Sequence, residues 1–308
     1  MTPKPIDRRD FLRAAGPGVI AGAELVRAAR PWAATPNTEP ASAAAPRLLT
    51  GCCAYSYSKL LGAGKMTMED VIRNAVALGI DGVDMTGYWF KSADPAYLAS
   101  LRHLAFKNGV CFSGAAIGAS TVQAEPGKRA EVLEEIKKWV DVTESLGAPH
   151  LRVFAGQLPA GATVQQAVGW TVETLKAACE YSSKKGITLG MEDHQGITQN
   201  SDTCLEIVHR VDSPFFGINL DITNFIPIAK ADAYSQIEAT APYATHTHIR
   251  DHFQNGEAVD LDRVWQIFAR ANYKGFMSAE YEGKEDATTG VPKLVAKIKT
   301  LCRKYSSV

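Results

Sequence analysis

Short apolar runs alternate with longer segments of helical period along the chain from Leu48 onward. The short runs contain many β-branched residues, which favour strands. The longer segments are amphipathic: Lys128–Leu146, for example, places Val132, Ile136 and Val140 at four-residue steps among Glu and Lys. This alternation is typical of parallel strands that are joined by helical crossovers.

The pattern predicts eight strand–helix units. The predicted strands are Leu48–Ala54, Gly82–Met85, Val110–Gly114, His150–Phe154, Ile187–Glu192, Phe216–Asp221, Thr245–Arg250 and Phe276–Tyr281. The predicted helices are Met68–Leu78, Pro95–Phe106, Lys128–Leu146, Val164–Lys184, Thr203–Arg210, Ala233–Ala239, Leu261–Ala269 and Val291–Tyr305. We therefore expect an α/β fold of the (β/α)₈ TIM-barrel type over residues 46–308. An open doubly wound sheet is the alternative, but no GxGxxG follows a predicted strand to support its nucleotide-binding form.

Residues 1–45 do not follow this pattern. Asp7–Arg13 contains a twin arginine followed by Phe-Leu and a basic residue, which resembles a twin-arginine export signal. A mildly apolar run, Ala14–Ala23, comes next, and Ala41–Ala43 offers a small-x-small cleavage site. We expect export, and hence a periplasmic or secreted catalytic domain. Because Glu24 and two arginines interrupt the apolar region, a disordered Ala/Pro-rich extension is the alternative.

Composition narrows the class of protein. A chain of 308 residues that is 46% hydrophobic can bury one large core. Its 33 basic and 33 acidic residues balance, so the basic excess of a nucleic-acid binder is missing. No run of about 18 apolar residues predicts a membrane span. The six cysteines show no CxxC spacing, and we interpret them as small buried residues.

Four consecutive predicted strands end in a residue type that binds metals. These residues are Glu192, Asp221, His248 and Glu280, each about one strand–helix unit from the next. The carboxyl ends of barrel strands meet at one rim, so the four side chains could reach one ion. Alone, each acid could be a solvated rim residue and the histidine a packed core residue. Together, three buried carboxylates would be costly without a cation.

The donor types bear on the identity of the ion. Carboxylate and imidazole ligands without a thiolate favour Mn, Mg or Co, and they also leave Zn open. We expect one divalent metal ion as the cofactor.

Four short segments carry a resemblance to a known group. They are Gly190–His194, Leu220–Asp221, His246–Asp251 and Ala279–Gly283. In this order they resemble the sugar phosphate isomerase/epimerase family of the xylose isomerase-like TIM barrel superfamily. The resemblance extends from Leu48 to about Cys302. It implies that the four strand-end residues bind one metal ion, and that Glu192 and Glu280 are catalytic and pass a proton on opposite faces of a sugar.

Two positions depart from the family pattern. Asn224 stands three residues after Asp221, where ketose epimerases have a histidine, and we treat it as a substrate-binding candidate. Arg250 follows the metal-binding histidine by two residues, where the wider family often has lysine. The endonuclease branch needs further histidines from the second and third strands. The predicted strands contain none there, so a trinuclear DNA-repair site is disfavoured.

The predicted chemistry is proton abstraction next to a carbonyl. A divalent ion on the carbonyl and the adjacent hydroxyl would stabilise an enediolate, and a nearby carboxylate would act as a positioned base. Returning the proton to the other face gives epimerisation, and returning it to the next carbon gives isomerisation. If the intermediate expels a β-substituent, the same site acts as a lyase or hydratase on a keto-sugar or glycoside. The sequence leaves these outcomes open.

Further substrate-binding candidates lie near the predicted ligands. His194 and His246 are each two residues from one of them and share its strand face. Arg250 and Arg152 could bind hydroxyl-rich or anionic groups. Trp89, in the loop after the second strand, could stack on a sugar. Packed histidines, rim salt bridges and core packing under the loop are the respective alternatives.

The expected partner is a small-molecule carbohydrate, with no nucleic acid and no stable membrane insertion. Export favours a free or oxidised sugar or a glycoside over a sugar phosphate. A non-catalytic exported sugar-binding protein is the competing class, and the sequence leaves open whether the chain forms a homo-oligomer.

Overall fold

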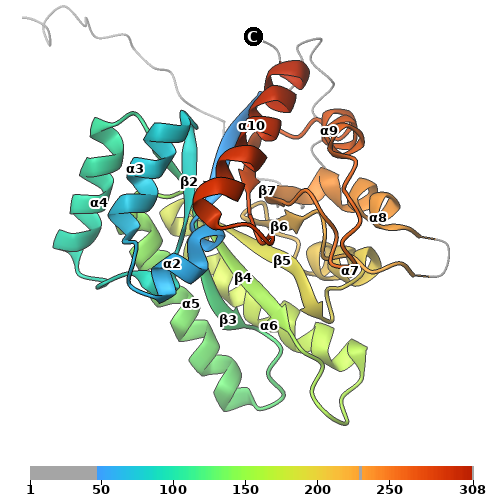
Figure 1. Cartoon of the computed structure of the whole chain (residues 1–308). Helices are drawn as coiled ribbons and strands as arrows, with labels where there is room; N and C mark the ends of the chain where they lie inside the picture. Colours follow the sequence, from blue (N-terminus) through green and yellow to red (C-terminus); the bar gives the residue numbers. More distant parts are fainter. Residues whose placement is uncertain (1–46, 229–230, 307–308) are drawn as a thin grey trace, which may run out of the picture. The chain divides into compact units, whose positions relative to one another are not determined.

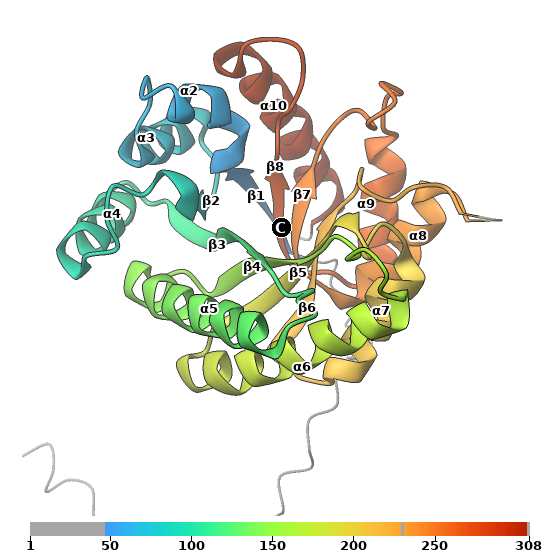
Figure 2. The ribbon, with the colours of Figure 1, turned by 90° about the horizontal axis from the view of Figure 1, so that it is seen from below.

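A closed parallel barrel forms the centre of the computed structural model, which describes residues 47–228 and 231–306. Its eight strands pair in chain order, and β8 closes the barrel on β1. Figure 2 shows the strands at the centre with the helices around them. The strands are β1 Leu48–Cys53, β2 Gly82–Thr86, β3 Cys111–Ser120, β4 His150–Gly156, β5 Thr188–Gly196, β6 Phe216–Asp221, β7 Ala244–Ile249 and β8 Gly275–Ala279. The predicted (β/α)₈ TIM barrel is confirmed.

A helix follows each strand and covers the outside of the barrel (Figure 1). The main helices are α3 Met68–Leu78, α4 Pro95–Lys107, α5 Pro126–Leu146, α6 Val164–Ser182, α7 Ser201–Val211, α8 Ala233–Thr240, α9 Leu261–Arg270 and α10 Ala287–Tyr305. A short additional helix, α2 Ser58–Gly62, follows β1 and was not predicted. None of the described helices combines the length and apolarity that a membrane span requires. The predicted export signal lies outside the described residues.

Local sequence explains how one unit leads into the next. At the start of α3, the Thr67 side chain accepts from the Asp70 N–H while the Asp70 side chain accepts from the Thr67 N–H, which forms a capping box. Val71, Ile72 and Ala75 are buried on one face of the helix. The helix ends at Gly79, whose φ of 59° is the left-handed cap that glycine adopts without strain. The chain then turns directly into β2.

Side chains from several strands fill the barrel interior around His150. Gly190 of β5 leaves room for the ring of His150, because a Cβ at Gly190 would lie 2.3 Å from the His150 Nε2. The rings of His150 and His246 stack, with 5.1 Å between their centroids. Thr245 Oγ1 lies 3.1 Å from the His150 Nε2. These contacts hold the His150 ring inside the barrel.

Two predicted strand ends are wrong in a way that bears on the site. The last two strands stop at Ile249 and Ala279, so Arg250 and Glu280 lie just beyond them. The Glu280 N–H still donates to the Ile249 carbonyl at 2.9 Å, but the next N–H, that of Tyr281, donates to the Ser56 hydroxyl instead. This change of partner turns the chain away from the sheet at the barrel rim.

Candidate metal centre

The four predicted ligands meet at the carboxyl end of the barrel. Glu192 comes from β5, Asp221 ends β6, His248 comes from β7, and Glu280 follows β8. Each offers one donor atom, and these atoms all lie within 4.8 Å of one another. None of the four side chains belongs to a residue more than 3% exposed. The structure therefore gathers three acids and an imidazole from successive strands around a common point.

Several donor atoms in this cluster lack a hydrogen-bond partner among the described residues. They are Glu192 Oε2, Asp221 Oδ2 and His248 Nδ1. Guanidinium nitrogens of Arg152 and Arg250 lie 3.0 Å and 2.9 Å from the two carboxylate oxygens without forming a hydrogen bond of good geometry, so these donor atoms keep the capacity to bind a further partner. Oxygen and imidazole donors at this spacing suit a divalent ion. The residues present thus fit the predicted metal.

Neighbouring groups orient Asp221. Its Oδ1 accepts from the Thr223 N–H at 2.9 Å and from the Thr223 hydroxyl at 2.8 Å, which leaves Oδ2 for the cluster. The Asp221 N–H in turn donates to Asp193 Oδ1 at 2.7 Å. Burial raises the pKa of Asp221 to about 6, and burial together with the charge of Asp221 raises the pKa of Asp193 well above its usual value. Asp193 is a structural support in this arrangement.

Arg152 lies beside Glu192 within the barrel. Its Nε is 3.0 Å from Glu192 Oε2, and its Nη1 donates to the Ile117 carbonyl at 2.8 Å. Burial alone would raise the pKa of Glu192, but the positive charge of Arg152 and the contact with His248 together outweigh it and lower the pKa to about 2. Glu192 is therefore a carboxylate at neutral pH. The predicted substrate-binding candidate Arg152 contacts a proposed ligand directly.

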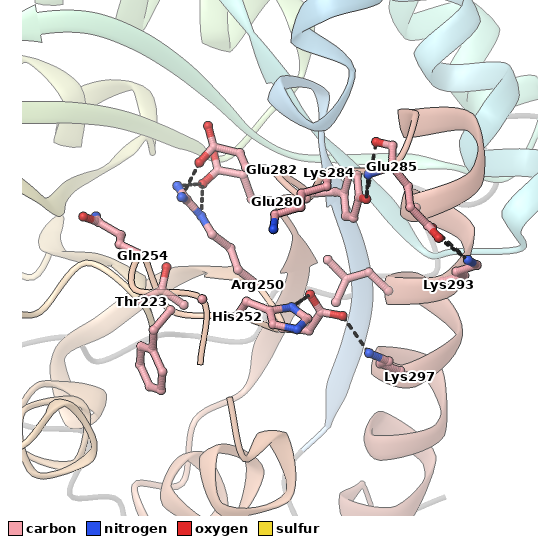
Figure 3. A pocket seen from close by; sticks show the side chains of 17 residues that line it. Thr223, Arg250, His252, Gln254, Glu280, Glu282, Lys284, Glu285, Lys293 and Lys297 are labelled. Atoms are coloured by element: carbon pink, nitrogen blue, oxygen red, sulfur yellow. Dashed lines mark hydrogen bonds and ion pairs between the residues drawn. The ribbon is translucent and has the colours of Figure 1, made fainter. Parts of the chain in front are cut away.

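Arg250 reaches the same cluster from the other side. Its Nη2 lies 2.9 Å from Asp221 Oδ2 and 2.7 Å from Glu280 Oε2, and its Nη1 pairs with Glu282. Figure 3 shows the guanidinium directed at Glu280 and Glu282. The side chain holds two of the four proposed ligands. A metal ion bound by the cluster would therefore share these carboxylates with a guanidinium.

The buried acids at the cluster outnumber the buried guanidinium groups. Glu192, Asp221 and Glu280 are joined by two more buried acids, Asp84 and Asp193, against the two guanidinium groups described above. The charge of Glu280 and the hydrogen bond with Asp84 also raise the pKa of His248 well above its usual value in spite of burial, so the ring carries part of the counter-charge. A divalent cation bound there would take the place of that proton and balance the remaining carboxylates.

The remaining polar candidates differ in their placement. Asn224 is buried, and its Nδ2 lies 3.5 Å from Glu192 Oε1. His194 is half-buried, its ring centroid 4.6 Å from that of Phe154, and burial lowers its pKa. His246 is buried below His248, and neither of its ring nitrogens has a hydrogen-bond partner in the described part of the chain. Burial lowers the pKa of His246 to about 4, so this ring is neutral.

An aromatic group and a cavity lie beside the cluster. The Trp89 ring centroid is 5.8 Å from that of Tyr55 and 5.7 Å from that of Tyr88.

A cavity of about 810 Å³ opens next to the acids, and its lining includes Thr223, Arg250 and Glu280. Figure 3 shows these residues around it. Cavities of this size accommodate small molecules.

The sequence analysis missed two residues at the cluster. Asp84 of β2 accepts a hydrogen bond from the His248 ring, and Cys53 offers a sulfur within 4.8 Å of donor atoms of His248 and Glu280. The available signal for Asp84 was a single acid within an otherwise apolar strand. Burial raises the pKa of Cys53 to about 12, so its thiol is neutral.

A closed parallel barrel with an acidic and imidazole cluster at the carboxyl ends of its strands defines a TIM-barrel enzyme scaffold with a candidate metal centre. The chain belongs to the xylose isomerase-like TIM barrel family, whose model matches residues 72–301. This membership confirms the resemblance inferred from the sequence.

Individual relatives are distant. A putative hydroxypyruvate isomerase from Mus musculus is 23% identical over 190 residues, which are 56% of this chain and 68% of the relative. The solved D-allulose 3-epimerase from Methylomonas sp. is 18% identical, with a TM-score of 0.64 over 86% of this chain and 100% of that chain. The solved probable 3-DHS dehydratase AsbF from Bacillus anthracis is 17% identical, with a TM-score of 0.65 over 82% and 98% of the two chains. At these identities the structures establish the shared fold.

Proposed function

We propose that the chain is a divalent-metal-dependent isomerase or epimerase of a small keto-sugar. The observation that carries this proposal is the convergence of donor atoms of Glu192, Asp221, His248 and Glu280 within 4.8 Å of one another, beside a cavity. The isomerase and epimerase names of similar proteins support the same class of reaction.

The proposed chemistry assigns separate tasks to the ion and to the chain. A bound divalent cation would polarise the substrate carbonyl and stabilise the negative charge that develops next to it. Glu192, kept ionised by Arg152, is the group that can accept a proton. Glu280 is held through Oε2 by Arg250, and its Oε1 lies 3.5 Å from His248 Nδ1. It is the second carboxylate that can return the proton.

The surrounding residues define the kind of substrate. Asn224 near Glu192 offers a donor and an acceptor for hydroxyl groups, and Arg250 offers further donors on the cavity wall. Tyr55 and Trp89 can pack against an apolar sugar face. We propose a hydroxyl-rich substrate without a phosphate group, since export by the predicted signal would put the reaction outside the cytoplasm.

Solvent exchange tests this function. The full chain, loaded with Mn²⁺ and incubated with keto-sugars in D₂O, should incorporate deuterium next to the carbonyl, as read by NMR after the metal is removed. Product analysis then separates an epimer, an aldose–ketose pair and an elimination product. Asp221→Asn should abolish exchange. A chain that binds Mn²⁺ but exchanges no proton and binds sugars tightly would instead be a binding protein.

Export is a separate part of the proposal. It rests on the twin arginine Arg8-Arg9 and the apolar run that follows. Replacing both arginines by lysine should retain the chain in the cytoplasm of a host that has the twin-arginine route, whereas the unchanged chain reaches the periplasm. Equal periplasmic amounts of the two forms would contradict it.

A further inference from the structure

A buried hydrogen bond crosses the barrel beneath the metal cluster. Asp84 Oδ2 of β2 lies 2.9 Å from His248 Nε2 of β7, and the two residues are 1% and 0% exposed. These strands are not neighbours, because β8 and β1 lie between them in the closed barrel. The contact is therefore a specific interaction across the interior and does not follow from sheet pairing.

The chemistry of the two groups fixes the direction of this bond. An ionised carboxylate can only accept, so His248 Nε2 carries the hydrogen and donates it. Burial alone would raise the pKa of Asp84, but the hydrogen bond from His248 and nearby positive charge lower it below its usual value. The other ring nitrogen, Nδ1, has no hydrogen-bond partner among the described residues. It lies 3.5 Å from Glu280 Oε1 and 3.7 Å from Glu192 Oε2.

We infer that Asp84 is a positioning residue that fixes the ring of His248 so that Nδ1, rather than Nε2, is the nitrogen presented to the cation. This inference rests on the metal centre of the proposed function. A carboxylate behind a metal-bound histidine sets its orientation and raises its basicity as a ligand. Without Asp84, the ring could rotate or carry its hydrogen on Nδ1, and the cluster would lose its nitrogen donor.

A second ion is the competing interpretation. Donor atoms of Asp84, His246 and His248 also lie within 4.8 Å of one another. A second ion there would have to bind His248 Nε2 after it lost its hydrogen, so that one ring would bridge two ions. Among the described residues, its other ligands would be Asp84 and His246. The 2.9 Å contact between Asp84 and His248 instead satisfies both groups directly. The geometry favours the orienting role.

The test measures Mn²⁺ binding to the metal-free full chain by calorimetry. The unchanged chain should bind one ion, and Asp84→Asn should weaken binding by about 10- to 100-fold at the same stoichiometry. The amide of the variant can donate to Nε2, which moves the ring hydrogen to Nδ1. Asp81→Asn is the matched control, because Asp81 accepts from the Thr50 N–H away from the cluster. It should bind Mn²⁺ as the unchanged chain does.

The outcomes distinguish a failure of the proposed metal centre from a failure of the role assigned to Asp84. If the unchanged chain binds no divalent ion, the proposed metal centre fails, and this inference fails with it. If the unchanged chain binds but Asp84→Asn binds equally well, only the inference fails. Loss of one ion from a two-ion chain would make Asp84 a ligand and also overturn it.

A second readout needs no variant. ¹⁵N NMR of the Zn²⁺-loaded, unchanged chain should show His248 with a hydrogen on Nε2 and with metal-bound Nδ1. The reverse assignment would overturn the inference even if Asp84→Asn failed to fold.

Discussion

Arg250 donates through Nη2 to Oε2 of Glu280 at 2.7 Å, so a fixed positive charge already sits on one of the proposed metal ligands. The same nitrogen lies 2.9 Å from Asp221 Oδ2. Two cations that share a pair of buried carboxylates repel each other, and at an effective dielectric constant of about 20 unit charges ~4 Å apart interact by about 4 kcal/mol. Arg250 thus sets how tightly this cluster can hold an ion.

Arg250→Gln should therefore tighten Mn²⁺ binding by about tenfold or more, which is about 1.4 kcal/mol. The same change should lower turnover, because the variant loses the donors that Arg250 offers to substrate. Calorimetry and steady-state kinetics separate the two effects. Arg270→Gln, which removes an exposed pair with Glu238, is the control and should change neither. Weaker Mn²⁺ binding in Arg250→Gln would mean that Arg250 organises the ligands for the ion.

The two glutamates give the second prediction. Glu192→Gln and Glu280→Gln should each lower kcat by at least about 100-fold, since each removes a group that moves a proton. Solvent exchange with a keto-sugar checks the step directly. Glu206→Gln, on the exposed face of α7, makes the same chemical change in a surface pair with Arg210 and should leave kcat unaffected. Near-normal exchange in either active-site variant would remove that residue from the proposed mechanism.

The sequence predicted the features that depend on residues close together along the chain. Strands and helices follow from the alternating pattern. Four ligands could be selected because each ends or nearly ends a predicted strand: Glu192, Asp221, His248 and Glu280. Asp84 could not be selected in the same way. Its partner His248 is 164 residues distant, and no periodicity reports a contact across the barrel.

The direction of individual side chains was a second feature that the sequence could not predict. His246 and His248 share a strand face by position, yet His246 packs in the layer below while His248 faces the acids. Arg250 was a candidate for binding substrate, and its reach to Asp221 and Glu280 depends on where β7 and β8 end. Just beyond β8 the Tyr281 N–H donates to the Ser56 hydroxyl, a contact between residues that are far apart in sequence.

Stability should fall as the pH falls below about 6.5. Burial lowers the pKa of His150 well below its usual value, so the folded chain keeps this ring neutral while the unfolded chain protonates it. The unfolded state then binds more protons, and the free energy of unfolding decreases with falling pH. Each such histidine contributes about 1 kcal/mol per pH unit between pH 6 and pH 5.

Urea unfolding at pH 7, 6 and 5 measures this dependence. His150→Gln should have a shallower slope by that amount, whereas His103→Gln, at an exposed position of α4, should keep the original slope. An unchanged slope in His150→Gln would show that His150 does not remain neutral in the folded chain.

Gly190 gives the last prediction because it admits the His150 ring into the barrel interior. A Cβ at this position would lie 2.3 Å from His150 Nε2 and 3.1 Å from Thr245 Oγ1. Gly190→Ala should therefore lower the free energy of unfolding by about 1–3 kcal/mol, the usual cost of overpacking. In α6, Gly169→Ala meets no atom closer than 4.0 Å and should be neutral or stabilise by up to about 1 kcal/mol. Equal urea midpoints for the two variants would mean that the His150 ring can move aside, and that the layer beneath the metal cluster is not closely packed.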